Sequence, residues 1–416
     1  MKKKHIAVVG GGITGCVTAL LAAKKGLDVS LYEISDSLGG VLKDLKAKDE
    51  RFINGCQYFE PAKWFNELQT HKEYEEIFHK LTLSHGSYTK FNNKSHAEKN
   101  YPEATFVDSF KNFKLNFKNQ NNLADRYECY PKKISQYLKK WVKRFQINLE
   151  DLKWNAASKG LLTSRIYLKK HLPEIIVYKK KDSLADELYG IPRTELNLKE
   201  VKAFLPRVGY DEFFSDIHKK LLNSGVKVFT KTPIRPNYSK NNFSLISGNK
   251  KIDCDYIVWS CNPTGLIKCY DNTKLQSKNI KVRVYCFNLD EKLNNHFYTH
   301  VYTKNSSIFR IFLYRLSGKS KITLECFDEE ENIKNITKNI SKILKDFKIN
   351  TKLSKKNLKL FNRQRRYFLV SLSDEKTLKT FFKKTKNSNL ICGAWNIYGR
   401  EKKIDYLESQ INSLIA

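Results

Sequence analysis

Three consecutive glycines stand ten residues into the chain, between an apolar strand-like run and a helix-like run of small residues. Residues 6–9 form a β-branched run, and a Gly10-x-Gly12-x-x-Gly15 pattern begins directly after it. The helix-like run ends near a further glycine, and residues 29–32 form the next strand-like run. A strand, tight turn, helix and strand within about 30 residues predict a dinucleotide-binding unit.

Each residue of the pattern has a physical role at a phosphate site. Gly10 permits a sharp turn, Gly12 lets the main chain approach a pyrophosphate, and Gly15 lets the helix pack against the strand. The start of the helix, with Thr14, offers free N–H groups and the positive end of a helix dipole. Glu33 follows about 20 residues later, where a carboxylate accepts hydrogen bonds from a ribose diol and repels the 2′-phosphate of NADP. The alternative is an ordinary glycine-rich turn and a surface glutamate.

A second glycine pair, Gly39 and Gly40, follows the acid and favours FAD over NAD. Such a pair lets another loop close over the pyrophosphate of a large, extended cofactor. Together with Glu33 and the first glycines, it resembles the N-terminal signature of the flavin clan of amine oxidases, protoporphyrinogen oxidases and UDP-galactopyranose mutases. Val41 stands where many members of this clan have Arg or Asn. No second G-x-G-x-x-G occurs downstream, so no built-in NAD(P)H domain is expected.

Later segments resemble the flavin domain of the same clan. Residues 204–230 resemble its "P-x-G-G … G-V-x-V" segment, which implies that Pro233 or Ile234 lies near the adenine. Residues 255–259 resemble another strand of that fold, although a purely structural strand explains them equally well.

The last segment of this kind is a strand over residues 389–393, followed by an apolar-striped helix over 404–415. By the resemblance, Gly393 lies against the flavin phosphate and ribityl chain. Ala394 replaces the Asp or Arg that most relatives carry there. Trp395 and Tyr398 are predicted either to line the flavin pocket or to pack in the core.

The resemblance implies an α/β fold: a discontinuous Rossmann-like FAD-binding domain of the glutathione-reductase type with an inserted α+β substrate domain. We expect residues 1–85, 204–270 and 366–416 in the first domain, and 86–203 and 271–365 in the second. Within the substrate domain, residue patterns predict helices at 130–145, 149–159, 200–204 and 334–347, and strands at 281–288, 296–302, 307–314 and 321–327.

Gln57 is one of two candidate catalytic residues. It lies in a segment, residues 52–59, that resembles the clan's "D/G-x-G-x-H-x-F" loop beside the flavin ring, at the position of the usual His. Glutamine can hydrogen-bond flavin or substrate but cannot titrate near neutral pH. We therefore do not expect acid–base work at this position, and an ordinary loop glutamine is the alternative.

Arg310 is the second candidate. Residues 302–315 and 321–325 resemble a segment of clan members found among polysaccharide genes, and in the mutase an Arg near this place grips a sugar diphosphate. A planar guanidinium suits such an anion. The alternative is an ion pair at a sheet edge.

The net charge of +33 comes mostly from lysines spread along the whole chain. This distribution favours an ordinary solvated surface and leaves attraction of anionic substrates open, while it does not favour nucleic-acid or membrane binding. Nine scattered cysteines without a C-x-x-C pair predict reduced thiols, a cytoplasmic location and no zinc site. The histidines show no metal-binding spacing, and no apolar run is long enough to span a bilayer.

These features together predict an FAD-dependent oxidoreductase that abstracts a hydride from a C–N or C–C bond of a small substrate. An anionic compound, an amine or a sugar nucleotide is a candidate substrate. The first alternative is a flavin-dependent sugar-nucleotide mutase with no net redox change. The second alternative is a non-catalytic, flavin-binding interaction protein, which only the high net charge suggests.

Overall fold

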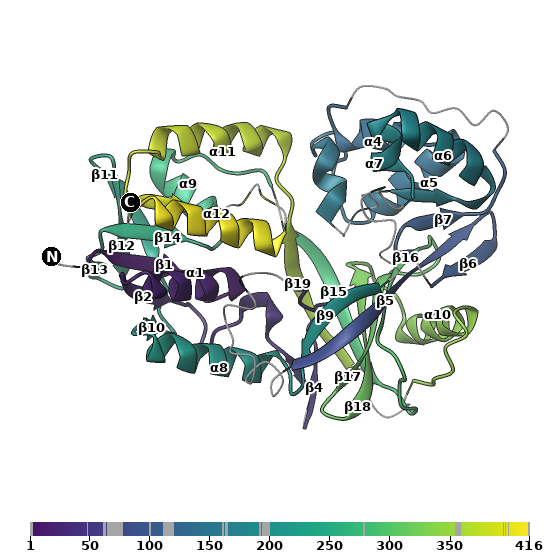
Figure 1. The fold of residues 1–416 in the computed structure, drawn as a ribbon, viewed down its shortest axis with the longest axis horizontal. Coiled ribbons are helices and arrows are strands. Elements are labelled where there is room, and N and C mark those ends of the chain that lie inside the picture. Colours follow the sequence, from purple (N-terminus) through teal and green to yellow (C-terminus); the bar gives the residue numbers. More distant parts are fainter. Residues whose placement is uncertain are drawn as a thin grey trace.

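Two β-sheets organise the chain, as the computed structural model shows (Figure 1). The first is a five-stranded parallel sheet, and the second is an eight-stranded, largely antiparallel sheet. The structure describes residues 3–47, 49–60, 64, 78–99, 101–110, 120–159, 162, 165–190, 193, 200–277, 279–353, 359–393, 395, 397 and 399–414.

The parallel sheet has the strand order β10-β2-β1-β14-β20, and all neighbouring strands run parallel. Both faces of β1, β14 and β20 are covered, which explains why these strands read as short apolar runs, whereas the edge strand β10 is largely exposed. All five strands coincide with runs that the sequence predicts. They are β1 (His5–Val9), β2 (Asp28–Tyr32), β10 (Lys227–Phe229), β14 (Tyr256–Trp259) and β20 (Leu390–Cys392).

Helices and a small sheet cover the two faces of the parallel sheet (Figure 1). One apolar core joins the sheet to α1 (Ile13–Lys24), α8 (Tyr210–Asn223) and α12 (Arg400–Asn412). A second core joins the other face to α9 (Thr264–Asp271), α11 (Leu372–Thr385) and the three-stranded sheet of β11 (Arg235–Ser239), β12 (Asn242–Ser247) and β13 (Lys250–Ile252). The layered α/β architecture confirms the predicted fold class.

The second sheet has the order β19-β15-β18-β17-β16-β5-β6, and β9 pairs with the first half of β5. Helix α10 (Ile333–Asp346) covers one face, and the other face packs against the parallel-sheet half and a helical lobe (Figure 1). The strands are β5 (Phe78–Phe91), β6 (Lys94–Glu98), β9 (Glu200–Pro206), β15 (Asn279–Asn288), β16 (Phe297–Tyr302), β17 (Ile308–Leu316), β18 (Lys319–Phe327) and β19 (Lys359–Phe368).

The helical lobe packs around fully buried aromatic side chains such as Tyr127, Trp141 and Tyr189. It contains α4 (Leu123–Glu128), α5 (Lys132–Lys143), α6 (Leu172–Lys181), α7 (Ser183–Leu188) and the paired strands β7 (Ala104–Phe106) and β8 (Ile166–Leu168). The remaining short elements are β3 (Leu45–Ala47), β4 (Glu50–Phe52) and 3-10 turns at Gly40–Leu42, Trp154–Lys159 and Lys169–His171.

Two helix predictions were wrong. Residues 200–204 belong to β9, because pairing with β5 overrides the weak helical preference of a five-residue segment. Residues 149–159 are helical only at Trp154–Lys159, and Leu152 instead bridges to Ser371. The division into two domains stays a prediction, and its boundaries near 86, 204 and 366 fall inside β5, β9 and β19.

Among the helices in the described ranges, none is both long enough and apolar enough for a transmembrane segment.

Candidate active site

The turn after β1 brings the main chain and α1 into very close contact. Gly10 has a φ of +110°, and a Cβ at this position would lie 2.6 Å from Sγ of Cys261 and 2.7 Å from Oγ of Ser260. A Cβ on Gly15 would lie 1.9 Å from the carbonyl oxygen of Gly10. Glycine is therefore required at both positions, and it allows α1 to pack directly on the turn.

Gly12, between these two positions, faces open space. A Cβ built on Gly12 meets no heavy atom within 4 Å. Gly12 is the N-cap of α1, no side chain caps this helix, and its first turn contains no acidic residue. Thr14 lies partly buried in the same turn. Open space in front of an uncapped helix N-terminus is a cradle that fits a phosphate group.

Glu33 follows β2 and turns its carboxylate toward the glycine turn. This buried side chain accepts hydrogen bonds from the N–H of Gly11 at 2.6 Å and from the N–H of Ser35 at 2.8 Å, one on each oxygen. The two donors fix the orientation of the carboxylate, and each oxygen keeps a lone pair for a further donor. Ile234 lies between β10 and β11 and packs against the core that contains Tyr32.

The Gly39–Gly40 loop lies over the first glycine turn. The N–H of Gly39 donates to the carbonyl oxygen of Gly11 at 2.8 Å. A Cβ on Gly40 would lie 3.5 Å from the Cα of Gly12. The two glycine segments therefore form one main-chain wall around the cradle.

Asp44 ties this loop region to α8. Its carboxylate accepts hydrogen bonds from the N–H groups of Tyr210 and Asp211 at 3.0 and 3.1 Å. Gly209 makes this approach possible, because a Cβ there would lie 2.1 Å from the Asp44 carboxylate. Burial raises the pKa of Asp44 to about 6, although these hydrogen bonds lower it.

This raised pKa predicts a pH dependence of stability. Protonation of Asp44 stabilises the fold at acid pH, and this contribution is lost as the pH rises from about 4 to about 6. We expect the free energy of unfolding of the native protein, relative to that of Asp44→Asn, to fall by about 3 kcal/mol between pH values of about 3.5 and 7. Denaturant titrations of both proteins measure this difference. A difference that does not change with pH would contradict the raised pKa.

Gly393 directly follows β20 on the same edge of the parallel sheet. A Cβ on Gly393 would lie 2.3 Å from the carbonyl oxygen of Trp259, so no larger residue fits. Trp395 is buried, donates its Nε1–H to the carbonyl oxygen of Cys261 at 2.7 Å and stacks on Phe382. The structure thus places Trp395 in the core beside Gly393. Ala394 and Tyr398, also named from the sequence, lie outside the described residues.

Gln57 contacts the first residue of α12. Its Oε1 accepts a hydrogen bond from Nη2 of Arg400 at 3.2 Å, and the carbonyl oxygen of Tyr58 accepts one from Nη1 at 3.3 Å. The guanidinium carbon lies 5.0 Å from the centroid of the Phe59 ring. The loop that carries Gln57 is therefore held against the N-terminus of α12.

Arg310 lies on β17, and its guanidinium is engaged by protein groups. Nε lies 2.9 Å from Oε2 of Glu325, Nη1 donates to the Tyr298 hydroxyl at 2.9 Å, and Nη2 donates to the Tyr367 hydroxyl. This is the ion pair that the sequence left as the alternative. The expected sheet-edge location was wrong, because β16 and β18 flank β17. A direct contact of Arg310 with substrate stays a prediction.

Arg366 connects this ion pair to the loop after the glycine pair. Its Nη1 lies 3.2 Å from Oε1 of Glu325, which is 0% exposed. Its Nη2 donates to the carbonyl oxygens of Asn54 at 2.5 Å and Val41 at 3.3 Å. Strand β19 thus supplies Arg366 to the loop that contains Val41. Many clan members have Arg or Asn at the position of Val41.

Aromatic and imidazole side chains extend the network toward the parallel-sheet half. The hydroxyl of Tyr58 lies 3.1 Å from Nε2 of His85, and the Tyr298 ring packs against the rings of His85 and His300. Burial lowers the pKa of His85 to about 4. Burial, with the nearby Arg310 charge, lowers the pKa of His300 well below its ordinary value. Both imidazoles are therefore neutral at pH 7 and can serve as hydrogen-bond partners.

Sequence reasoning missed Arg400, His85 and His300. The last helix was predicted from residue 404, whereas α12 begins at Arg400. When the apolar stripe of this helix is extended back by one turn, it includes Arg400. This helical spacing is the sequence signal that could have identified Arg400. The histidines lie far apart in the sequence, and only the pairing of β5 with β16 brings them together. In the described part of the chain, no group of acidic, His or Cys side chains could hold a metal ion.

Residues 8–78 match the family of NAD(P)-binding Rossmann-like domains. A 4,4′-diapolycopen-4-al dehydrogenase from Metabacillus indicus is 25% identical over 316 residues, which make up 69% of this chain and 62% of that protein. The chain therefore spans about three fifths of the length of this relative.

Solved structures resemble the chain over its whole length. Reduced UDP-galactopyranose mutase superposes with a TM-score of 0.70 and 11% identity, over 100% of this chain and 94% of the mutase. A double mutant of putrescine oxidase superposes with a TM-score of 0.61 and 10% identity, over 99% of each chain. At these identities the likeness concerns the fold.

The fold and the site define a protein in which residues 8–78 match a Rossmann-like dinucleotide-binding domain and a second, larger sheet accompanies the parallel one. The chain has the fold of the amine oxidase-like clan, and the resemblance drawn from the glycine motifs is confirmed at this level. Two of the three similar proteins are named as oxidoreductases and one as a mutase.

Proposed function

We propose that the chain is an FAD-dependent oxidoreductase of the amine oxidase-like clan that takes a hydride from a small substrate. The phosphate cradle is the observation that carries this proposal. Open space at Gly12 lies before the uncapped α1, the Gly39–Gly40 loop closes over it, and the Glu33 carboxylate is fixed beside it. These features match what the ADP half of a dinucleotide needs.

The proposed cofactor contacts come from separate strand ends of the parallel sheet. Gly10, Gly12, Thr14 and Gly15 would surround the pyrophosphate together with Gly39 and Gly40, and Glu33 would accept hydrogen bonds from the ribose. Ile234 would lie near the adenine, and Gly393 would leave room for the ribityl chain, with Trp395 supporting it from the core. Bound FAD would supply the isoalloxazine that accepts a hydride.

The chain's own side chains would bind the substrate and exclude water. Tyr58, His85, Tyr298 and His300 form a cluster of contacting rings, called here the neutral wall, that can accept or donate hydrogen bonds. Gln57 would orient substrate or cofactor at the end of this wall without moving a proton. Nine free cysteines support a reducing, cytoplasmic compartment.

A spectrum of the purified protein tests the cofactor. We expect flavin absorbance bands and their loss when a substrate amine or other hydride donor is added without oxygen. Dithionite should bleach the same bands as a control. A colourless protein that binds NAD instead would contradict the proposal.

A sugar-nucleotide mutase is the second candidate, because the mutase superposes over nearly its whole length with a TM-score of 0.70. The sequence favoured a mutase partly because Arg310 could bind a sugar diphosphate. The ion pair of Arg310 with Glu325 weakens this argument. Binding of UDP-sugars to the dithionite-reduced protein only, without bleaching of the oxidised protein, would favour the mutase. Bleaching by an amine without UDP-sugar binding would favour the oxidoreductase.

A further inference from the structure

Arg400 places a cation on the core-facing side of α12. It lies in helical register with Ile404, Leu407 and Ile411, each of which is 0% exposed. Burial lowers the pKa of the Arg400 guanidinium, since a desolvated charge is unfavourable. Its hydrogen-bond partners on the Gln57 loop are an amide oxygen and a carbonyl oxygen, both of which are neutral.

Other largely buried arginines of this chain face a carboxylate. A buried cation without an anion is costly, and proteins therefore pair such charges. The pairs are Arg126 with Glu187, Arg144 with Glu329, Arg283 with Asp328, and both Arg310 and Arg366 with Glu325.

No carboxylate of the described residues forms an ion pair with Arg400. Electrostatic interactions with Tyr210, Glu60, Tyr58 and Tyr367 raise its pKa, but by less than burial lowers it. Lys403, one turn further along α12, adds a second partly buried cation, and burial and the Arg400 charge lower its pKa. The N-terminus of α12 also contributes the positive end of its dipole, and its N-cap, Gly399, has no side chain to cap it. Within the described ranges, this region therefore combines two partly buried cations and a helix N-terminus without an ion-paired carboxylate.

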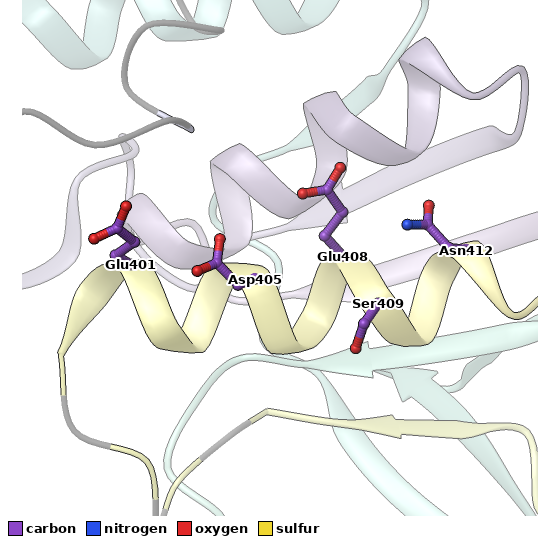
Figure 2. Close-up of a pocket in the computed structure, with 5 residues that line it drawn as sticks. All are labelled: Glu401, Asp405, Glu408, Ser409 and Asn412. Atoms are coloured by element: carbon purple, nitrogen blue, oxygen red, sulfur yellow. The ribbon is translucent and has the colours of Figure 1, made fainter.

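The acidic residues of α12 lie on a different face of the helix. Figure 2 shows Glu401, Asp405, Glu408 and Asn412 on the side of α12 toward α1, and with Ser409 they line a pocket. Glu408 lies 3.7 Å from Lys25, just after α1, so this face borders α1. The acidic stripe is an ordinary solvated face, and it does not neutralise Arg400.

We propose that Arg400, supported by Lys403, binds a carboxylate or phosphate group of the substrate. This inference rests on the proposed function, because it assigns an anionic substrate to the flavin-loaded protein. The proposed cradle for the dinucleotide phosphates lies at the N-terminus of α1, whereas Arg400 lies at the start of α12. The planar fork of an arginine suits both oxyanions. Gln57 and Tyr58 accept hydrogen bonds from the Arg400 guanidinium. Tyr58 is itself part of the neutral wall, so Arg400 lies at the edge of that wall.

Inorganic phosphate and acetate are the probes for this site. Calorimetric titration of the flavin-loaded protein should show saturable binding of at least one of them. Arg400→Gln should weaken this binding by about tenfold or more, and Arg400→Lys should weaken it less. Arg363→Gln, which removes an exposed arginine of β19 paired with Asp328, is the matched control and should leave binding unchanged.

A second measurement separates binding from a structural role. Adding phosphate or acetate should raise the melting temperature of the native protein, because an anion that binds only the folded state stabilises it, and Arg400→Gln should lose this anion-dependent rise. An anion-dependent rise of the same size in Arg400→Gln would overturn the proposal. Binding unaffected by Arg400→Gln, or binding only to protein stripped of flavin, would also overturn it. If the purified protein contains no flavin, the proposed function fails instead, and the absorbance spectrum shows this independently.

Discussion

Gly12→Asp is expected to give a colourless protein whose cofactor-free form is at least as stable as the native cofactor-free protein. Gly12 is an N-cap with φ −72° and ψ 172°, a conformation that aspartate adopts readily, and a Cβ there meets no atom within 4 Å. An N-cap aspartate stabilises a helix by a few tenths of a kcal/mol relative to glycine. The same carboxylate would occupy the phosphate cradle. Two like charges about 4 Å apart cost about 4 kcal/mol at an effective dielectric constant of about 20, which is about a thousandfold loss of affinity.

Gly15→Ala is the matched control for this prediction. The added Cβ would lie 1.9 Å from the carbonyl oxygen of Gly10, so the turn must move and both stability and flavin content should fall. Thermal unfolding of cofactor-free protein and flavin absorbance after reconstitution measure the two effects. Normal flavin content in Gly12→Asp would show that the cradle does not bind the pyrophosphate.

Glu325→Gln is expected to lower the free energy of unfolding by about 3–5 kcal/mol. The carboxylate is 0% exposed and neutralises Arg310 and Arg366 at once. Glutamine keeps the shape but leaves two buried guanidinium groups without an anion. Because Arg366 also binds the carbonyl oxygens of Val41 and Asn54, we expect the loop after Gly39–Gly40 to lose order as well.

Glu212→Gln provides the comparison for an exposed ion pair. Glu212 pairs with Arg51 at 2.9 Å, and both side chains remain well exposed, at 49% and 38%. Loss of such a pair should cost less than about 1 kcal/mol. Denaturant titration of the three proteins measures both changes. A loss in Glu325→Gln no larger than that in Glu212→Gln would mean that solvent reaches the network.

The parallel-sheet half was predictable because its signals are local. A tight turn that brings a helix onto a strand can only be built with glycine, so the residues from Gly10 to Gly15 fix the local geometry wherever they occur. Buried parallel strands also need apolar runs, which made β1, β2, β14 and β20 visible in the sequence, whereas the more exposed edge strand β10 was found by its resemblance to a clan segment. The positions of Glu33 and the Gly39–Gly40 pair followed from the same short-range spacing.

The second half was less predictable because its contacts are long-range. The segment 200–204 reads as helical by itself, and only its pairing with β5 makes it a strand. The sequence identified Arg310 as a candidate site residue. Its pairing with Glu325, however, depends on the register of β17 against β18. Arg400 carried a weak signal in the helical stripe, whereas only its three-dimensional neighbours show that no carboxylate of the described residues pairs with it.

The sequence by itself therefore determined the dinucleotide-binding turn and the parallel sheet, because glycine geometry and apolar runs act over a few residues. The clan followed from the resemblance of the glycine motifs to its N-terminal signature. The tertiary structure decided which charges neutralise one another: Glu325 serves two arginines, and Arg400 has no carboxylate partner among the described residues. The physical reason is that a buried charge is compensated by whatever lies within a few ångströms of it, and strands distant in sequence provide those neighbours.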